Sequence, residues 1–187
     1  MPIQITTLIE NSPDEKNLLQ YEHGLSFYIE KDNEKMLFDT GQSGAFIKNA
    51  AQLGKDLSTL DHVLLSHGHY DHTGGFTALC EKSKIFQLHI KERLFRKKYT
   101  QKNGTYTFKG NNFDEQFLQK RGIAYAFIEQ DVTEIIGGVY AITNFPRIYA
   151  DEVMNPNFQV ETDSGYKQDY FEDEVLLALD TSKGLVV

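Results

Sequence analysis

Cysteine is nearly absent from this sequence. The one residue of this kind, Cys80, cannot form a disulfide within the chain, so a cytoplasmic, reducing compartment is expected. No apolar run approaches membrane-spanning length, and the first residues have neither the basic nor the apolar region of a secretion signal. The sequence therefore disfavours a disulfide-rich secreted scaffold and a membrane protein.

Positive charge is also scarce. Lys and Arg number 19 against 27 Asp and Glu, and the formal net charge is −8. Since nucleic acids and anionic membranes bind basic surfaces, neither is expected as a partner, and a small molecule is the expected substrate. With 187 residues, 40% of them hydrophobic, the chain fits one globular domain over residues 1–187.

The basic residues that do occur are unevenly placed. Residues 91–98 carry five basic groups beside Glu92, whereas residues 151–174 carry eight acidic groups beside Lys167. Two interpretations stay open. The two segments are solvated faces that pair with each other, or the basic segment lies at the mouth of a pocket for an anionic substrate.

Hydrophobic patterning predicts alternating strands and helices in the first half of the chain. An apolar face predicts a helix between Ser43, a capping residue, and Gly54. The expected strands cover 3–10, 25–30, 35–39, 62–66 and 84–90, and the expected helices cover about 43–53 and 75–82. This alternation is typical of an α/β sandwich.

The second half has weaker signals. Residues 91–122 lack a clean period and are expected to form an irregular insertion or cap, with short helices around a loop or hairpin. Strands are expected over 123–129 and 137–145, an acidic loop over 151–174, and a hairpin over 175–187 that turns at 181–184.

The most informative stretch is His67-Gly68-His69-Tyr70-Asp71-His72, which holds three of the 6 histidines in the chain. It follows an expected strand, so His67 and His69 point to one side. Asp71 and His72 come where the chain turns towards the next helix, and the following Gly74-Gly75 allows close backbone approach. Imidazoles and carboxylates together suit zinc, and also iron or manganese. A surface cluster without a ligand is the alternative.

Four ligands from six consecutive residues cannot reach one ion without strain. We therefore expect His67 and His69 to bind one metal ion, and Asp71 and His72 to bind a second ion nearby. Two such ions can bind one water, lower its pKa and polarise a substrate oxygen. The motif thus predicts a dinuclear centre that activates water.

This H-x-H-x-D-H motif, placed between an apolar strand and a glycine pair, resembles the signature of the metallo-β-lactamase superfamily. The upstream LFDTG, which contains Asp39, is similar to a second landmark of that superfamily. GLSFYIE, LFDTGQSGAF and GLVV resemble one branch, the dihydropterin-methyl-aminobenzene-phosphate synthase-like hydrolases. The resemblance is specific over about residues 22–90 and at the end of the chain, and vague over 91–170.

The resemblance implies a four-layer αββα sandwich and a metal-dependent hydrolase of a small, anionic ester-like or cyclic substrate. It assigns His67 and His69 to one divalent ion and Asp71 and His72 to another, with zinc as the expected metal. Asp71 would also orient the attacking water. Asp39 would steady the ligands from behind, and a turn-capping aspartate is its alternative role.

Further ligands implied by the resemblance have no counterpart here, because no histidine follows His89. We therefore expect a sandwich that is incomplete in its C-terminal half, with empty or partly filled metal sites. A homodimer is one way to cover the apolar surface left exposed. An iron-dependent redox enzyme on the same fold and a non-catalytic fragment remain as alternatives.

Overall fold

The computed structural model describes residues 3–83, 85–149 and 151–187. Residues 1–2, 84 and 150 of the expected domain, including Lys84 at the start of an expected strand, lie outside this description. The strands are β1 (Gln4–Ile9), β2 (Ser26–Lys31), β3 (Glu34–Phe38), β4 (His62–Leu64), β5 (Gln87–Ile90), β6 (Lys98–Lys102), β7 (Thr105–Phe108), β8 (Ala124–Phe127), β9 (Val132–Ile136), β10 (Val139–Ile142), β11 (Phe158–Thr162), β12 (Gly165–Gln168), β13 (Leu176–Thr181) and β14 (Gly184–Val186). The helices are α1 (Ala45–Gln52), α2 (Tyr70–Thr73), α3 (Phe76–Lys82) and α4 (Glu115–Arg121), with 3-10 turns η1 (Leu57–Thr59) and η2 (Glu92–Phe95).

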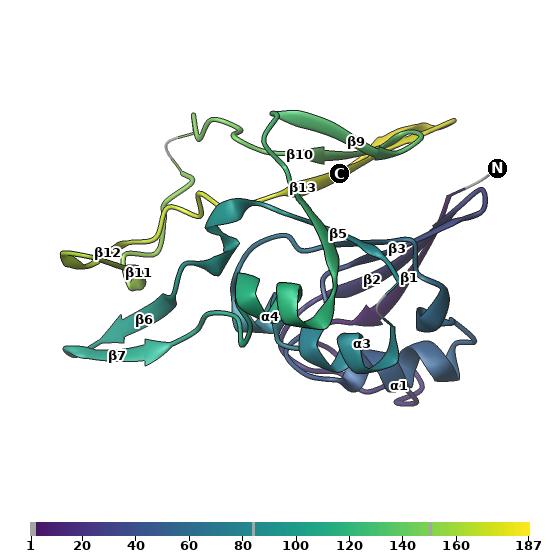
Figure 1. The fold of residues 1–187 in the computed structure, drawn as a ribbon, viewed down its shortest axis with the longest axis horizontal. Coiled ribbons are helices and arrows are strands. Elements are labelled where there is room, and N and C mark those ends of the chain that lie inside the picture. The colour runs from purple at the N-terminus through teal and green to yellow at the C-terminus, as the bar shows by residue number, and fades with distance from the viewer. Residues whose placement is uncertain (1–2, 84, 150) are drawn as a thin grey trace.

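Six strands form a mixed sheet in the order β1-β2-β3-β4-β5-β8 (Figure 1). The first three strands pair antiparallel, and β3, β4, β5 and β8 run parallel. Because parallel strands must be joined by crossovers, the loops that follow β3 and β4 leave the sheet at the same edge. The histidine motif begins in the loop after β4.

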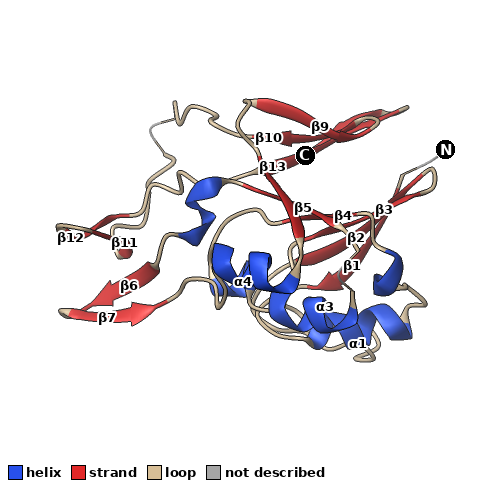
Figure 2. Cartoon of the chain, in the orientation of Figure 1, coloured by secondary structure: helices blue, strands red, loops and turns tan. Residues whose placement is uncertain are grey.

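Helices α1, α3 and α4 cover one face of this sheet (Figure 2). Phe46 of α1, Leu79 of α3 and Leu118 of α4 share a core with Leu37 and Val63 of the sheet. These side chains are almost completely removed from water, and burial of this apolar area stabilises the helix layer.

Helix α1 begins close to its predicted position. Its N-cap residue is Gly44, while the Ser43 hydroxyl accepts a hydrogen bond from the Ala45 N–H at 3.1 Å. The chain leaves the helix through Gly54, which has a φ of +70° that favours glycine.

The other face of the sheet packs against an antiparallel sheet of four strands, β14-β13-β10-β9. Ile29 and Leu64 from the first sheet meet Val139 and Leu179 from the second in a separate core. Within the described residues, the sandwich has one layer of helices and two of strands. The α/β sandwich predicted from the sequence is confirmed.

A third sheet lies at one end of the sandwich, in the order β12-β11-β6-β7. Strand β6 comes from the segment 91–122 and pairs with β11 of the acidic segment 151–174, so that Phe158 faces Thr100. The sequence predicted no strand within 151–174. The β7 end of this sheet adjoins the motif, because the Tyr70 N–H donates to the Lys109 carbonyl at 2.9 Å.

Among the described helices, none combines the length and the apolar character needed to cross a membrane.

Candidate metal centre

The structure gathers the motif histidines at one rim of the sandwich. The ring centre of His67 lies 4.9 Å from that of His69 and 4.3 Å from that of His72. His67 and His69 follow β4 in extended backbone, whereas Asp71 and His72 lie in the short helix α2. Phe171, from the acidic segment, packs against the rings of both His67 and His69.

Asp39 lies directly behind these histidines and is fully buried. One carboxylate oxygen accepts from the Ser66 N–H at 2.7 Å, and the other accepts from the Ser66 hydroxyl and from His72 Nδ1, both at 2.7 Å. Its φ of +58° is a left-handed conformation that is costly for most residues and tolerated by aspartate. A carboxylate that serves three donors from such a position acts as a support for the motif.

The same hydrogen bonds set which ring nitrogens carry protons. A carboxylate only accepts, so His72 Nδ1 is protonated and its Nε2 is left with a lone pair. The Ser66 hydroxyl gives its proton to Asp39 and accepts from His67 Nδ1 at 2.9 Å, which leaves His67 Nε2 with a lone pair as well. Both rings therefore present a nitrogen suited to a metal ion.

Asp71 completes the second pair of the motif. Its Oδ2 lies 3.5 Å from His72 Nε2 and 3.4 Å from the Nε2 of His23. His23 precedes β2 and lies outside the motif, so nothing in its sequence neighbourhood indicated that it would reach the site.

Burial keeps two of the histidines neutral. It lowers the pKa of His67 well below its usual value, with smaller contributions from His72 and His69. Burial, assisted by the Lys98 ammonium, lowers the pKa of His69 to about 4. For His72, burial acts in the same direction, but the carboxylates of Asp39, Asp71 and Glu174 together outweigh it and the pKa is raised. Neutral imidazole is the form that binds a metal ion.

One atom at this rim lacks a partner. His69 Nε2 is buried and makes no hydrogen bond, and the nearest carboxylate oxygen, Asp169 Oδ2, is 3.9 Å away. A buried polar atom without a hydrogen bond is costly, and a bound cation would satisfy it. In the described residues, no group of three or more His, Cys, Asp and Glu side chains is arranged as a complete ligand set. His67, His69, Asp71 and His72 are therefore the candidate ligands at this rim, and their division between two ions stays a prediction.

The basic and acidic segments meet beside the motif. Arg93 and Arg96 both form ion pairs with Glu172, and Lys97 lies 3.4 Å from Glu161. The interpretation that these two faces pair with each other is confirmed. The buried members of this contact, Lys98, Asp169 and Asp173, were not identified from the sequence.

Two glycines of the motif loop are required by close backbone contacts. A Cβ at Gly68 would lie 2.3 Å from the Leu94 carbonyl oxygen. A Cβ at Gly75 would lie 2.3 Å from the carbonyl oxygens of Thr40 and Ser43. The glycines thus allow the motif loop to pack against neighbouring backbone of η2 and of the loop after β3.

A hollow of about 670 Å³ opens beside Phe171. Its lining includes Phe171, Tyr170 and the basic side chains Lys91, Arg93 and Arg147. Phe171 is shared between this hollow and the rings of His67 and His69. The volume is in the range of pockets that bind small molecules.

Two packed sheets with helices on one face, and imidazoles gathered where β4 ends, define the fold class of the metal-dependent hydrolases. The chain belongs to the metallo-β-lactamase superfamily, whose family model matches residues 21–153. The resemblance noted from the motif is thereby confirmed.

Three relatives agree with this assignment. The chain is 26% identical over 200 residues to 7,8-dihydropterin-6-methyl-4-(β-D-ribofuranosyl)-aminobenzene-5'-phosphate synthase of Methanocaldococcus jannaschii, a match that covers 99% of this chain and 66% of the synthase. It is 28% identical over 147 residues to exodeoxyribonuclease WalJ of Streptococcus pneumoniae, covering 78% of this chain and 52% of that protein. The solved structure of Tm1679, a metal-dependent hydrolase of the β-lactamase superfamily, has 30% identity and a TM-score of 0.76, and the match covers 99% of this chain and 64% of that one. This chain thus spans less than two thirds of the length of each of these proteins.

Proposed function

We propose that this protein is a metal-dependent hydrolase that uses a dinuclear centre on a small, anionic ester-like or cyclic substrate. The observation that carries the proposal is the buried His69 Nε2, which has no hydrogen-bond partner and lies beside His67 and His72 at one rim. Family membership and the likeness to Tm1679 support a hydrolase, while a relative named as a synthase limits the proposal to the reaction class.

The residues fit two ions. His67 and His69 would hold one divalent ion, and Asp71 and His72 would hold a second, with zinc proposed and manganese or iron as alternatives. When bound, such ions lower the pKa of a water molecule and polarise a substrate oxygen.

The chain's own residues have separate tasks in this proposal. Asp39 keeps the proton on His72 Nδ1 and, through Ser66, on His67 Nδ1, so that both Nε2 atoms point away from their supports. The Asp71 carboxylate, within 3.5 Å of His72 Nε2, accepts a hydrogen bond from the attacking water and so orients it.

The hollow beside Phe171 is the proposed substrate-binding region. Its wall carries three basic side chains, Lys91, Arg93 and Arg147, and four acidic ones, Glu92, Glu129, Glu172 and Glu174. Arg93 is paired with Glu172, and Arg147 is paired with Glu174. An anionic substrate would displace these carboxylates and pair with the arginines in their place. We propose a small molecule, since no broad basic stripe for nucleic acid is present in the sequence.

The metal proposal is tested by titrating the dialysed protein with zinc and measuring bound metal by elemental analysis. His69→Ala should weaken zinc binding by more than the roughly 10–100-fold expected for loss of a residue behind the ligands, because it removes one of two protein ligands. His89→Ala, which removes a half-buried histidine that bonds to His62 rather than to the motif, is the matched control. Equal zinc binding in the two variants would contradict the proposed ligands.

Substrate class is tested with the metal-loaded protein against a generic phosphodiester, a lactone and single-stranded DNA. Hydrolysis of the first or second, lost in His69→Ala and kept in His89→Ala, is the expected result. Cleavage of DNA alone would replace the small-molecule proposal by an activity like that named for WalJ. An iron signal in place of zinc, with no hydrolysis, would favour a redox enzyme.

The proposed compartment is the cytoplasm. Its basis is the single cysteine, Cys80, which lies in α3 and is buried in the core.

A further inference from the structure

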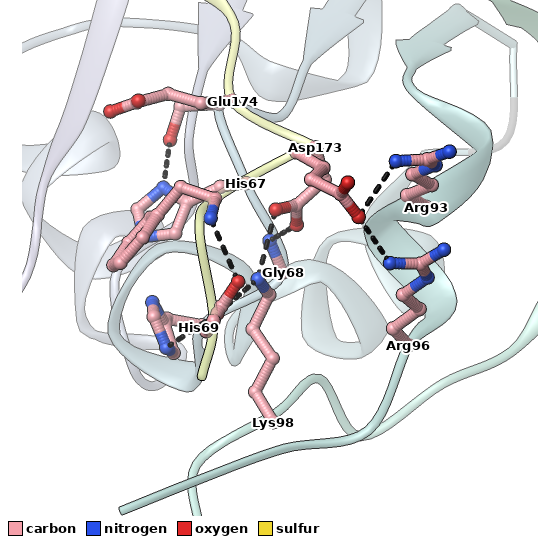
Figure 3. A network of polar contacts seen from close by, with 12 residues as sticks. His67, Gly68, His69, Arg93, Arg96, Lys98, Asp173 and Glu174 are labelled. Atoms are coloured by element: carbon pink, nitrogen blue, oxygen red, sulfur yellow. Dashed lines mark hydrogen bonds and ion pairs between the residues drawn. The ribbon is translucent and has the colours of Figure 1, made fainter. Parts of the chain in front are cut away.

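A buried ionic cluster lies behind the two histidines of the H-x-H segment. The Lys98 ammonium donates to Asp169 Oδ2 at 2.7 Å and to Asp173 Oδ1 at 2.8 Å (Figure 3). The three side chains are between 1% and 3% exposed. Lys98 begins β6, whereas both aspartates lie between β12 and β13, so the cluster joins segments about 70 residues apart.

The second oxygen of Asp173 reaches the motif itself. Asp173 Oδ2 accepts a hydrogen bond from the Gly68 N–H at 2.7 Å, and this contact is buried. Gly68 is the single residue between His67 and His69, so its backbone orientation fixes the direction of both imidazoles. A nearby backbone hydrogen bond, from the Val175 N–H to the Ser66 carbonyl at 2.8 Å, holds the residue before His67 to the segment that contains Asp173.

Asp169 acts on the same rim through a neighbour. Its Oδ1 accepts from the Phe171 N–H at 2.8 Å, and the Phe171 ring packs on His67 and His69. The Lys98 ammonium also lies 5.2 Å from the centre of that ring. One lysine therefore fixes two carboxylates, of which one holds the backbone of the motif and the other holds the ring that covers it.

We expect the buried cluster of Lys98, Asp169 and Asp173 to be stable when all three charges are present and to be disrupted when one is removed. A buried charge that loses its partner is strongly destabilising, whereas a complete buried pair contributes little net stability. An aspartate serves two donors with two oxygens, but an asparagine has a single acceptor oxygen. At position 173, asparagine can therefore satisfy Gly68 or Lys98, and not both.

We propose that Asp173 is a positioning residue for the H-x-H segment, with Lys98 and Asp169 holding its carboxylate in place. No direct contact of Asp173 with the substrate or the ions is required. The inference rests on the proposed function only where its test measures zinc or cobalt binding.

The test compares Asp173→Asn with Glu161→Gln. Glu161 forms an exposed ion pair with Lys97, the neighbour of Lys98, and does not contact the motif. Both changes remove one negative charge from the acidic segment 151–174. We expect Asp173→Asn to weaken zinc binding by roughly 10–100-fold and to alter the visible absorption spectrum of bound cobalt, and Glu161→Gln to change neither. A role confined to stability would lower the melting temperature and leave the cobalt spectrum of the folded protein unchanged.

A second measurement needs no metal and no variant. In the metal-free wild-type protein, NMR should detect a coupling across the hydrogen bond between the Gly68 amide and the Asp173 side-chain carboxyl carbon. Absence of that coupling overturns the proposal even when Asp173→Asn does not fold.

The two proposals fail in different ways. A wild-type protein that binds neither zinc nor cobalt contradicts the proposed function, and the NMR coupling then decides the positioning role. A wild-type protein that binds metal, with Asp173→Asn giving the same affinity and cobalt spectrum, overturns the positioning role and leaves the proposed function standing.

Discussion

Asp39 supports two histidines through one carboxylate, and this makes a conservative substitution informative. Asp39→Asn keeps a residue that tolerates a φ of +58°, but it removes the negative charge beside His72. The raised pKa of His72 should therefore fall, because the Asp39 carboxylate makes the largest contribution that opposes the effect of burial. Zinc binding should weaken by roughly 10–100-fold. An NMR titration of the His72 ring and a zinc titration measure the two effects.

Asp32 offers a control of the same chemistry. It is an aspartate with a φ of +55° in the turn between β2 and β3, away from the motif. Asp32→Asn should leave both the His72 titration and zinc binding unchanged. If Asp39→Asn behaves as Asp32→Asn does, Asp39 has only the turn-forming role.

His89 should make the stability of the protein depend on pH. Burial, together with the nearby His62, lowers its pKa from 6.5 to about 4 in the folded chain. Below pH 6.5, His89 takes up a proton in the unfolded chain but stays neutral in the folded chain. The free energy of unfolding therefore decreases as the pH is lowered from 6.5 to about 4. His89→Gln should remove roughly 1–2 kcal/mol of this loss, after allowance for solvent screening.

Urea unfolding at pH 7 and at pH 4 measures that difference. A loss of stability between the two values that is as large in His89→Gln as in the wild type would assign the acid sensitivity to other groups.

At the scale of elements, two helices begin at glycines that differ in their surroundings. Gly75 precedes α3, and a Cβ there would lie 2.3 Å from two backbone carbonyl oxygens. Gly44 precedes α1, and its Cβ would meet the Ala78 side chain at an ordinary 3.5 Å. Both have a negative φ, so backbone strain does not distinguish them.

Gly75→Ala should therefore destabilise the protein by roughly 2 kcal/mol or more, since backbone must move to admit the methyl group. Gly44→Ala should cost less than about 1 kcal/mol, the ordinary difference between the two residues at an N-cap. Thermal unfolding compares the pair, and equal losses would contradict the importance of the contact at Gly75.

The elements that the sequence predicted are those with a one-sided or continuous apolar pattern. Strands β2, β3 and β4, and helix α1, bury most of their apolar residues, and their expected positions agree with the structure. Strand β7 is exposed along its whole length, and β11 buries Val160 alone. Neither strand leaves an apolar period in the sequence, because β7 pairs with its hairpin neighbour β6 at an exposed edge and β11 pairs with β6 from a distant segment.

The residues of the candidate site also fall into two groups, those identified from the sequence and those that were not. The four motif residues were identified because their spacing is local and their chemistry is specific. Lys98, Asp169 and Asp173 contact each other or the motif across 71 to 105 residues of chain. Nothing in a single sequence links charges over such separations, so segments 91–98 and 151–174 could be described only as two charged faces.

At the scale of the whole molecule, the two main sheets share one core, and Leu64 of β4 is fully buried in it, immediately before the motif. Leu64→Ala should lower the free energy of unfolding by roughly 2–5 kcal/mol, because it removes buried area and leaves a cavity. Leu18→Ala, at a side chain that is 61% exposed, should change it by less than about 0.5 kcal/mol.

The same unfolding curves test whether residues 1–187 form a single domain. Far-ultraviolet circular dichroism reports on the sheets, and tyrosine fluorescence, compared between the wild type and a variant in which Tyr99, Tyr106 and Tyr166 are replaced by Phe, isolates the signal of the third sheet. Coincident transitions by the two probes are expected for one cooperative unit. Earlier loss of the tyrosine signal would make the third sheet a separate unit.

The pairing of β6 with β11 also has a consequence for the order of events during folding. These strands lie roughly 60 residues apart in the chain, and contacts of such separation form late because a long loop must close first. The strand and helices that present the histidines are built from local contacts, whereas the packing of the His69 ring on Phe158 requires β11. On a chain emerging from the ribosome, we therefore expect the imidazoles to be assembled and open to water before Phe171 and Lys98 take their places. Newly made protein would then have an interval in which these rings are accessible to solvent, and that interval would end when β11 joins β6.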